Sequence, residues 1–409
     1  RPPMPTDTSS IRFNDRVAAM QPSATLAMKS RATEMRRKGH PVVALSAGEP
    51  DFDTPRTISE AGIEAIRSGY THYTENPGGM ELREAISNKL ARDNGLQYKP
   101  SQILCSNGAK QSIALATTVL CDEGDEVLIP APYWVSYPEM ARFAGAEPVV
   151  VSASVENEYR LTPEQLDEAL TDRTRLFILC SPSNPTGSVY TEDELEALAE
   201  VFRQYPDVYV LADEIYEYVL FDDAEHVSFA SLDGMYDRTI TVNGFSKGFA
   251  MTGWRLGYLA APEPITKACA KVQGQFTSAP CSVSQKAGTA AMTMDMSPVY
   301  RMVEAFRQRR DYMVERLRQI DGIRCPMPKG AFYLYPDVSA FFGAKTPGGT
   351  TIDDSSDLCF YLLEEQHVAL VPGTAFGAPN GLRISYASSM EDLETAMDRI
   401  QEGLDHLSA

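Results

Sequence analysis

The chain has 409 residues, of which 43% are hydrophobic, 9% aromatic and 23% charged. This composition is typical of soluble globular proteins and excludes disordered, collagen-like and coiled-coil chains, and the length predicts two or three domains. Thirty-seven basic against 56 acidic side chains give a net charge of −19, which repels nucleic acid and anionic lipid, so we expect neither as a partner.

Strands and helices alternate along the central part of the chain. Charged amphipathic stretches separate apolar runs that we interpret as strands, at Glu126–Ile129, Leu176–Cys180, Tyr209–Ala212 and Thr239–Val242. We expect a helix over Thr191–Tyr205, where apolar residues recur at helical spacing. We expect a second, longer helix over Val299–Ile320, which is rich in Arg. This alternation predicts an α/β fold with a mainly parallel sheet.

The pattern of predicted elements changes after Gly322. Short strands and turns are expected there, followed by a terminal helix from Glu391 to about Leu407. We interpret this part as a smaller α+β domain that also includes the N-terminal segment. The predicted division is therefore 1–54 for the N-terminal segment and lid, 55–315 for the large domain and 316–409 for the small one. A polar insertion, Gly343–Ser356, is expected to be an exposed, mobile loop.

The ends of the chain and its cysteines bear on the compartment. No apolar run reaches the roughly 18–20 residues that a bilayer crossing requires. Seven scattered cysteines without CxxC or Cys/His spacing predict reduced thiols, with neither a disulfide framework nor a metal site. The chain begins at Arg1 with a Pro/Thr/Ser-rich lead, which we interpret as a processed product whose targeting peptide is missing.

Polar residues that could take part in catalysis or binding follow several predicted strands. Asp213 ends the apolar strand from Tyr209, and Lys247 and Arg255 follow the strand from Thr239. The carboxyl ends of parallel strands form the ligand crevice of α/β sheets, where a desolvated lysine becomes a nucleophile and an arginine can hold a phosphate. Taken singly, Asp213 also fits a salt bridge or helix cap, and Lys247 a surface position.

Three further loops point to the same crevice. The junction Gly108–Ala109–Lys110 joins a strand to a helix, whose free N–H groups can hold a phosphate. Asn184 lies in a proline-built turn, and Trp134 follows another strand. Each loop also has another interpretation. The Gly108–Lys110 junction lacks a complete phosphate-binding motif and is a weak signal when taken alone. The turn at Asn184 also fits a purely structural role, and Trp134 also fits ordinary core packing.

Together these residues match the needs of pyridoxal phosphate. The cofactor requires an amine for its aldehyde, an acid for its ring nitrogen, a donor near its phenolic oxygen, a phosphate cradle and a stacking surface. The residues predicted to fill these roles, in that order, are Lys247, Asp213, Tyr216, the Gly108–Lys110 junction with Arg255, and Trp134.

The motifs SNGAKQ, APYWVSYPEM, SPSNPTG, ADEIY, SKGFAMTGWRLGY and RISYAS closely resemble those of class I aminotransferases of the pyridoxal-phosphate fold-type I superfamily. The resemblance extends from about Ile11 to Leu404. Motifs such as GEPDFDTP and VALVPGTAFG are most similar to the plant and algal bifunctional aspartate/prephenate aminotransferases. The family resemblance implies a large, mainly parallel-sheet domain, a smaller α+β domain and a homodimer with shared active sites.

The resemblance also implies roles for residues that spacing does not reach. Arg383 would hold the substrate α-carboxylate, helped by Asn184 and the backbone of Gly48, and Tyr73 would reach the partner subunit's cofactor phosphate. The positions implied for the distal carboxylate, with Trp134 alongside, are Lys110, Ser23 and Thr25. For Lys110 the alternative is a backbone N–H contact alone.

Two glycines near Lys247 depart from the family pattern. Gly244 stands where many relatives have a phosphate-binding Ser or Thr, and we expect Ser246 to substitute in part for that contact. Gly248 stands where alanine is usual among similar proteins. It adds local freedom after the lysine, and we expect it to be tolerated.

The resemblance implies a ping-pong transfer of the amino group of aspartate or glutamate to 2-oxoglutarate, oxaloacetate or prephenate, the last giving arogenate. The alternatives are an aspartate aminotransferase without prephenate activity, a β-lyase or cyclopropane-forming synthase on the same fold, and a cofactor-sensing regulator. The charge of −19 and the short N-terminal lead count against the regulator. The plant-like motifs predict a plastid location, and a bacterial source would predict a cytoplasmic one.

Overall fold

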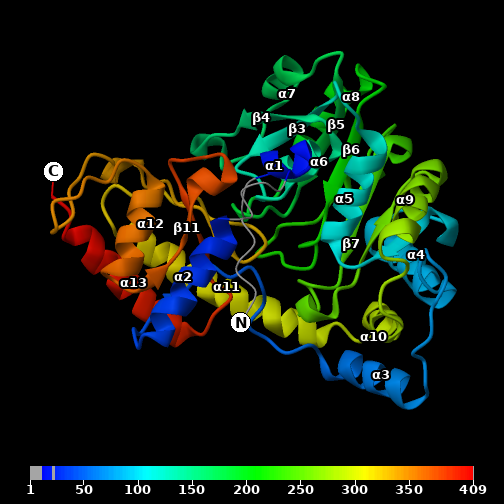
Figure 1. Ribbon diagram of the computed structural model, residues 1–409, viewed down its shortest axis with the longest axis horizontal. Coiled ribbons are helices and arrows are strands. Elements are labelled where there is room, and N and C mark those ends of the chain that lie inside the picture. The colour runs from blue at the N-terminus through cyan, green and yellow to red at the C-terminus, as the bar shows by residue number, and fades with distance from the viewer. Residues whose placement is uncertain (1–11, 21–23, 409) are drawn as a thin grey trace, which may run out of the picture.

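The computed structural model describes residues 12–20 and 24–408 (Figure 1). Its main sheet has the strand order β2-β8-β7-β6-β5-β3-β4. The strands are β2 Ile103–Ser106, β3 Glu126–Ala131, β4 Glu147–Ser152, β5 Thr174–Cys180, β6 Tyr209–Asp213, β7 Thr239–Gly244 and β8 Gly257–Ala260. All pairs from β7 to β4 are parallel, and β8 is antiparallel to both neighbours. The expected α/β class with a mainly parallel sheet is confirmed.

The central strands are buried on both faces, which explains their continuous apolar runs. Successive side chains of β5 alternate between the two faces: Leu176 and Ile178 pack on one side of the sheet, Phe177 and Leu179 on the other. Helices cover both faces, so most residues of these strands are buried. The polar residues that follow the strands therefore emerge at the edge of the sheet.

The helices of the large part pack against these two faces and against the β2–β8 end of the sheet (Figure 1). They are α3 Arg56–Arg67, α4 Met80–Asn94, α5 Ala109–Leu120, α6 Tyr137–Ala144, α7 Pro163–Ala169, α8 Glu192–Arg203, α9 Glu263–Phe276 and α10 Ser282–Thr293. Helix α8 confirms the helix expected over Thr191–Tyr205. Its N-cap Thr191 forms a capping box with Glu194, which explains where the helix begins.

The N- and C-terminal parts of the chain share a second core. Strand β1 (Val43–Ala44) pairs in parallel with β10 (Val368–Ala369), and β11 (Val371–Pro372), β12 (Leu382–Ser385) and β9 (Tyr333–Leu334) form an antiparallel sheet. Around them lie α2 Ala24–Arg37, α11 Ser297–Arg318, α12 Ser355–Glu364 and α13 Met390–Asp405. A further helix, α1 (Asp15–Ala19), contacts α6.

The division into domains at residue 315 remains a prediction, and it falls inside α11. Met313, Val314 and Leu317 of this helix all belong to the core shared with α12 and α13, so its C-terminal half packs as one unit across that position. The insertion at 343–356 has an exposed tip, but Ile352 is 1% exposed and packs in the same core. This apolar anchor ties down a segment that the sequence suggests is loose.

Two observations bear on surroundings and redox state. Within residues 12–20 and 24–408, no helix is both long and apolar enough to cross a membrane. All seven cysteines lie in this part of the chain and are free, as expected from their spacing. Burial raises the pKa of five of them to about 12, namely Cys105, Cys121, Cys180, Cys269 and Cys325, because a thiolate is poorly solvated in the interior.

Candidate active site

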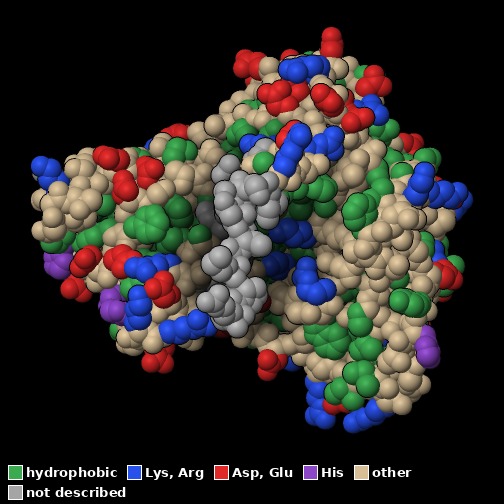
Figure 2. All heavy atoms as spheres, viewed as in Figure 1, with side chains coloured by type: hydrophobic (Ala, Val, Ile, Leu, Met, Phe, Trp, Pro, Cys, Tyr) green, Lys and Arg blue, Asp and Glu red, His purple; other side chains and the backbone are tan. Residues whose placement is uncertain are grey.

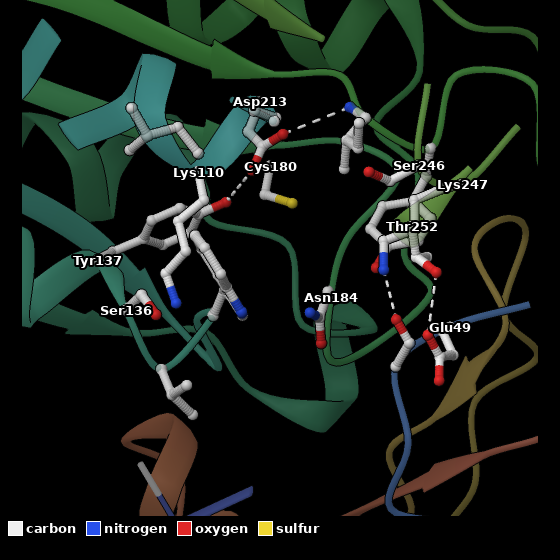
Figure 3. A pocket seen from close by; sticks show the side chains of 18 of the residues that line it. Glu49, Lys110, Ser136, Tyr137, Cys180, Asn184, Asp213, Ser246, Lys247 and Thr252 are labelled. Atoms are coloured by element: carbon white, nitrogen blue, oxygen red, sulfur yellow. Dashed lines mark hydrogen bonds between the residues drawn. The ribbon is translucent and has the colours of Figure 1, made fainter. Parts of the chain in front are cut away.

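The residues that follow the strands meet in one cavity of about 350 Å³ at the carboxyl edge of the sheet (Figure 3). The small part of the molecule closes its other side with Tyr333 of β9 and Arg383 of β12. Of the residues predicted from the sequence, those that line it are Gly48, Gly108, Ala109, Lys110, Trp134, Asn184, Asp213, Tyr216, Ser246, Lys247, Arg255 and Arg383.

Three predicted site residues are not brought into this cavity within the chain. Tyr73 does not line it, and its side chain is 99% exposed. Ser23 and the side chain of Thr25 lie outside the described residues. Their roles stay predictions that follow from the family resemblance.

Asp213 is a buried acid at the end of β6. Its Oδ2 accepts a hydrogen bond from the Tyr137 hydroxyl at 2.6 Å, and its Oδ1 accepts one from the backbone N–H of Ile215 at 3.3 Å. Burial raises the pKa of Asp213 to about 6, although the bond from Tyr137 favours the ionised form and opposes that rise. The carboxylate can therefore hold a protonated group across the cavity near neutral pH.

Lys247 follows β7 and points into the cavity, where its ammonium donates to the carbonyl of Gly48. Its nitrogen lies 5.8 Å from the ring centre of Tyr216 and 5.7 Å from that of Phe332. Lys247 is half-buried, and protein atoms on most sides of its amine keep water away from it. This desolvation and the nearby Arg383 lower its pKa to about 8, so the group can take up and release a proton near neutral pH.

A second corner of the cavity is built to receive a phosphate. Helix α5 begins at Ala109 after Gly108, whose φ is +87°, and Arg255 donates to the carbonyls of Asn107 and Thr252 from the opposite side. A Cβ on Gly108 would lie 2.7 Å from the Arg255 guanidinium, so glycine keeps this corner open. Free N–H groups and a guanidinium together favour an anion.

The packing around Gly244 accounts for the departure noted in the sequence. A Cβ at this position would lie 3.0 Å from the Cα of Gly257 and 3.1 Å from the Leu256 carbonyl. The close approach of β7 and β8 therefore disfavours a larger residue there. Ser246 lines the cavity, and its contact with a phosphate stays a prediction.

The buried guanidinium of Arg383 is ready to receive a carboxylate. It donates to the Asn184 side-chain oxygen at 3.0 Å and to the Ser46 carbonyl at 2.8 Å. The rings of Tyr333 and Phe376 lie 4.7 and 5.1 Å from it. Its Nε has no hydrogen-bond partner among the described residues. A buried guanidinium with an unused donor is a site for a planar anion.

Lys110 lies on the side of the cavity away from Lys247 (Figure 3), and it lies over the indole of Trp134. The Lys110 ammonium is 5.0 Å from the indole centre, and the indole in turn contacts the ring of Tyr137 edge-on at 5.3 Å. Desolvation and the charge of Arg255 lower the pKa of Lys110. When protonated, Lys110 offers the cavity a second positive charge, at a different point from Arg383.

Several cavity residues were not assigned a role from the sequence. Tyr137 lies within the quoted motif APYWVSYPEM and begins α6, and Cys180 is the last residue of β5, so their positions were an available signal. Glu49 accepts a hydrogen bond from Thr252 at 3.0 Å, and the Tyr333 and Tyr216 hydroxyls are 2.8 Å apart. Nothing in the local sequence of Tyr333 links it to Tyr216, 117 positions earlier.

The cavity is positively charged in an acidic protein. Figure 2 shows Lys and Arg side chains gathered in the hollow between the two parts of the molecule. Four cationic residues, Lys110, Lys247, Arg255 and Arg383, line the cavity against the two carboxylates Glu49 and Asp213. This local field attracts small anions while the net charge of −19 repels polyanions.

The family model for class I and II aminotransferases matches residues 40–400. The chain belongs to this family. This aminotransferase is 54% identical, over 397 residues, to a bifunctional aspartate aminotransferase and glutamate/aspartate-prephenate aminotransferase from Petunia hybrida, covering 96% of this chain and 83% of that protein. It is 46% identical to an aspartate/prephenate aminotransferase from Cereibacter sphaeroides, covering 95% and 98% of the two chains.

Solved structures agree with this assignment. The crystal structure of the aspartate aminotransferase from Rhizobium meliloti superposes with a TM-score of 0.95 at 43% identity, covering 97% of this chain and all of that one. The Thermus thermophilus aspartate aminotransferase with maleate gives a TM-score of 0.90 at 42% identity, covering 96% and 99%. The expected fold-type I architecture of the aminotransferase is confirmed.

Class I and II aminotransferases use pyridoxal 5′-phosphate, and the cavity fits this cofactor. The bound cofactor supplies an aldehyde for an amine and a ring that draws electrons from the substrate carbon. Lys247 would bond to the aldehyde, and Asp213 would face the ring nitrogen. The corner at Gly108, Ala109 and Arg255 would hold the phosphate, because it has free donors and no Cβ in the way.

Proposed function

We propose that this aminotransferase moves the amino group of aspartate or glutamate to oxaloacetate, 2-oxoglutarate or prephenate, the last giving arogenate. The observation that carries the proposal is the presence in one cavity of two cationic side chains, at separate points, each of which can receive a carboxylate. Arg383, paired with Asn184, would take the α-carboxylate. Lys110, over Trp134, would take the distal carboxylate. A cavity with a single cation would instead favour monocarboxylate amino acids.

The names of similar proteins support dicarboxylate substrates. The Petunia and Cereibacter relatives are named for both aspartate and prephenate, and the Thermus structure contains maleate, a dicarboxylate. A relative from Pinus pinaster, 52% identical over 96% of this chain, is named an aspartate aminotransferase alone. Aspartate is thus common to these relatives, and prephenate is the activity that needs its own test.

The residues of the cavity divide the work of transamination between them. Arg383 and Lys110 orient the amino acid so that its α-carbon faces Lys247. The Lys247 Nζ, whose pKa is near 8, would take the proton from that carbon and pass it to the cofactor carbon that bears the amino group, so that the amino group stays with the cofactor and the substrate leaves as its keto acid. Asp213 stays ionised opposite a protonated ring nitrogen throughout. The second keto acid then binds to the same two cations and is aminated in the reverse sense.

We also propose that the active enzyme is a homodimer in which Tyr73 completes the partner's phosphate site. The side chain of Tyr73 is exposed and does not line the cavity of its own chain, which suits a contact made across an interface. Sedimentation of the loaded enzyme should give a dimer. Tyr73→Phe should weaken cofactor binding, and a monomeric active enzyme would contradict this assignment.

A coupled assay tests the substrate assignment. Cofactor-loaded enzyme is given aspartate and prephenate, and oxaloacetate is followed with malate dehydrogenase, beside a parallel reaction with 2-oxoglutarate. Turnover in both supports the full proposal, and turnover with 2-oxoglutarate alone removes prephenate. The absence of turnover in both reactions would favour a β-lyase reaction on this fold. Lys247→Ala serves as the blank, because without its amine turnover should be lost.

The role of Lys110 can be separated from that of its backbone. Lys110→Ala keeps the N–H at the start of α5 but removes the ammonium from Trp134. We expect kcat/KM for aspartate to fall by about tenfold to a hundredfold, while that for alanine, which has no distal carboxylate, stays unchanged. Lys99→Ala, an exposed lysine outside the cavity, is the matched control. Equal losses for both substrates would leave Lys110 with a backbone role only.

We propose a plastid location for this aminotransferase, supported by its resemblance to the plant bifunctional enzymes and by its similarity to the Petunia protein. Expression of the complete coding sequence with a C-terminal fluorescent tag, in plant cells, tests this. Fluorescence in chloroplasts is the expected result, and a uniform cytosolic signal would contradict it.

A further inference from the structure

The strongest feature that the proposed chemistry leaves unused is the hydrogen bond between Tyr137 and Asp213. Tyr137 is the first residue of α6, and its side chain is 2% exposed. Its hydroxyl donates to Asp213 Oδ2 at 2.6 Å (Figure 3). We propose that Tyr137 is a positioning residue that keeps the Asp213 carboxylate ionised and orients it toward the ring nitrogen of the cofactor.

The first step of the argument concerns the surroundings of Asp213. Among the described residues, only the Tyr137 hydroxyl and the Ile215 N–H donate hydrogen bonds to this carboxylate, and the latter bond is the longer, at 3.3 Å. The acid is 5% exposed. A buried carboxylate without a good donor takes up a proton, because the interior solvates its charge poorly.

The other titratable groups near Asp213 do not replace this donor. Cys180 lies opposite it in the β5–β6 pairing, with a raised pKa near 12. Glu214 is adjacent in the chain and repels its charge, whereas Lys247 attracts it from the far side of the cavity. Neither Cys180 nor Lys247 donates a hydrogen bond to the acid. The ionised form therefore depends on Tyr137 more than on any other side chain.

Tyr137 also connects the acid to the aromatic wall. The Trp134 indole, in the segment just before α6, contacts the Tyr137 ring edge-on, at 5.3 Å and 81°. Tyr137 binds Oδ2 and the Ile215 N–H binds Oδ1, so the two bonds together fix the orientation of the carboxylate plane. A protonated, rotated carboxyl would lose this orientation and could no longer stabilise a ring cation.

The test measures the ionisation of Asp213 in the full chain prepared without cofactor, so it does not depend on the identity of the substrate. Carboxyl infrared bands are followed from pH 4 to 9 in the wild type, and Asp213→Asn identifies the band. In Tyr137→Phe we expect the midpoint to rise by about one pH unit, the effect of one charge-assisted hydrogen bond. Tyr133→Phe, which removes a hydroxyl from the same loop that does not contact Asp213, should leave it unchanged.

Kinetics provide a second measurement. Tyr137→Phe should lower kcat about tenfold or more with KM for aspartate within about twofold, because Tyr137 does not contact Arg383 or Lys110. An unchanged midpoint in folded Tyr137→Phe would overturn the proposal. If that variant does not fold, 3-fluorotyrosine placed at position 137 keeps the shape and is a stronger donor. It should lower the midpoint, and an unchanged or higher midpoint would equally overturn the proposal.

Discussion

At the residue scale, the cavity depends on atoms that are absent as much as on those present. Gly257 of β8 lies so close to the start of α5 that a Cβ would be 2.3 Å from the Ala109 nitrogen. Gly248, next to the lysine, faces the ring of Tyr218, 2.8 Å from where its Cβ would be. The second observation adds a steric reason to the conformational one suggested by the sequence.

The contact at Gly257 predicts a specific defect. Gly257→Ala should displace the first turn of α5, because backbone atoms cannot rotate away, and overpacking of this kind costs about 1–3 kcal/mol. We expect weaker binding of pyridoxal phosphate and a lower thermal midpoint, measured by fluorescence titration and calorimetry. Gly253→Ala is the control, since a Cβ there meets nothing within 4 Å. Equal cofactor affinity in both variants would contradict the expectation.

At the element scale, local signals set the helix boundaries well. The Thr191 side chain caps α8, and those of Asp354 and Ser389 cap α12 and α13 in the same manner. These caps are short-range contacts, so they are legible in the sequence. The short strands β9 and β10 are different, because their pairing partners are distant in the chain: Leu334 pairs with Ile384, and Val368 pairs with Val43.

The cap of α8 gives a prediction at this scale. Thr191→Ala removes the side-chain acceptor for the Glu194 N–H and should lower the free energy of unfolding by about 1 kcal/mol, measured by urea unfolding at fixed protein and cofactor concentration. Thr191→Ser retains the hydroxyl and should recover most of the loss. A Ser variant as unstable as the Ala variant would assign the effect to the lost methyl group.

At the scale of the whole molecule, a buried charge cluster supports the segment that carries Asp213 and Tyr216. On the side away from the cavity, Glu214 pairs with His226 at 3.1 Å, and Glu217 pairs with Lys89 of α4. Asn94 bridges toward Ser228 at 2.9 Å. Segments far apart in the chain thus support the segment of Asp213 and Tyr216, with Lys89 as the positive partner of Glu217 and His226, when protonated, as that of Glu214.

The cluster makes stability depend on pH. Burial lowers the pKa of His226, but the charge and hydrogen bond of Glu214 outweigh it, so the pKa is raised above 6.5. The stabilisation is therefore complete below pH 6.5 and is lost as the pH rises through the folded-state pKa. His226→Gln should destabilise the protein more at pH 5.5 than at pH 9 in urea unfolding. The exposed His406→Gln should show no such difference, and a pH-independent loss in His226→Gln would contradict the mechanism.

The sequence alone was sufficient for the fold class and for the residues at the strand ends, because burial on both faces and chemistry at the carboxyl edge are properties of consecutive residues. Lys247, Asp213, Asn184 and Gly108 could be found in this way. The family motifs then led to Arg383 and Lys110, which no local pattern singles out as ligand-binding.

Only the tertiary structure decided which side chains act on one another. The bond from Tyr137 to Asp213, the pair Tyr216–Tyr333 and the contact of Gly257 with Ala109 each join residues more than 70 positions apart. Their effect depends on distances of a few ångströms and on exclusion of water, which the order of residues does not specify. The sequence determined the chemical groups, and the packing of the two cores decided their ionisation and orientation.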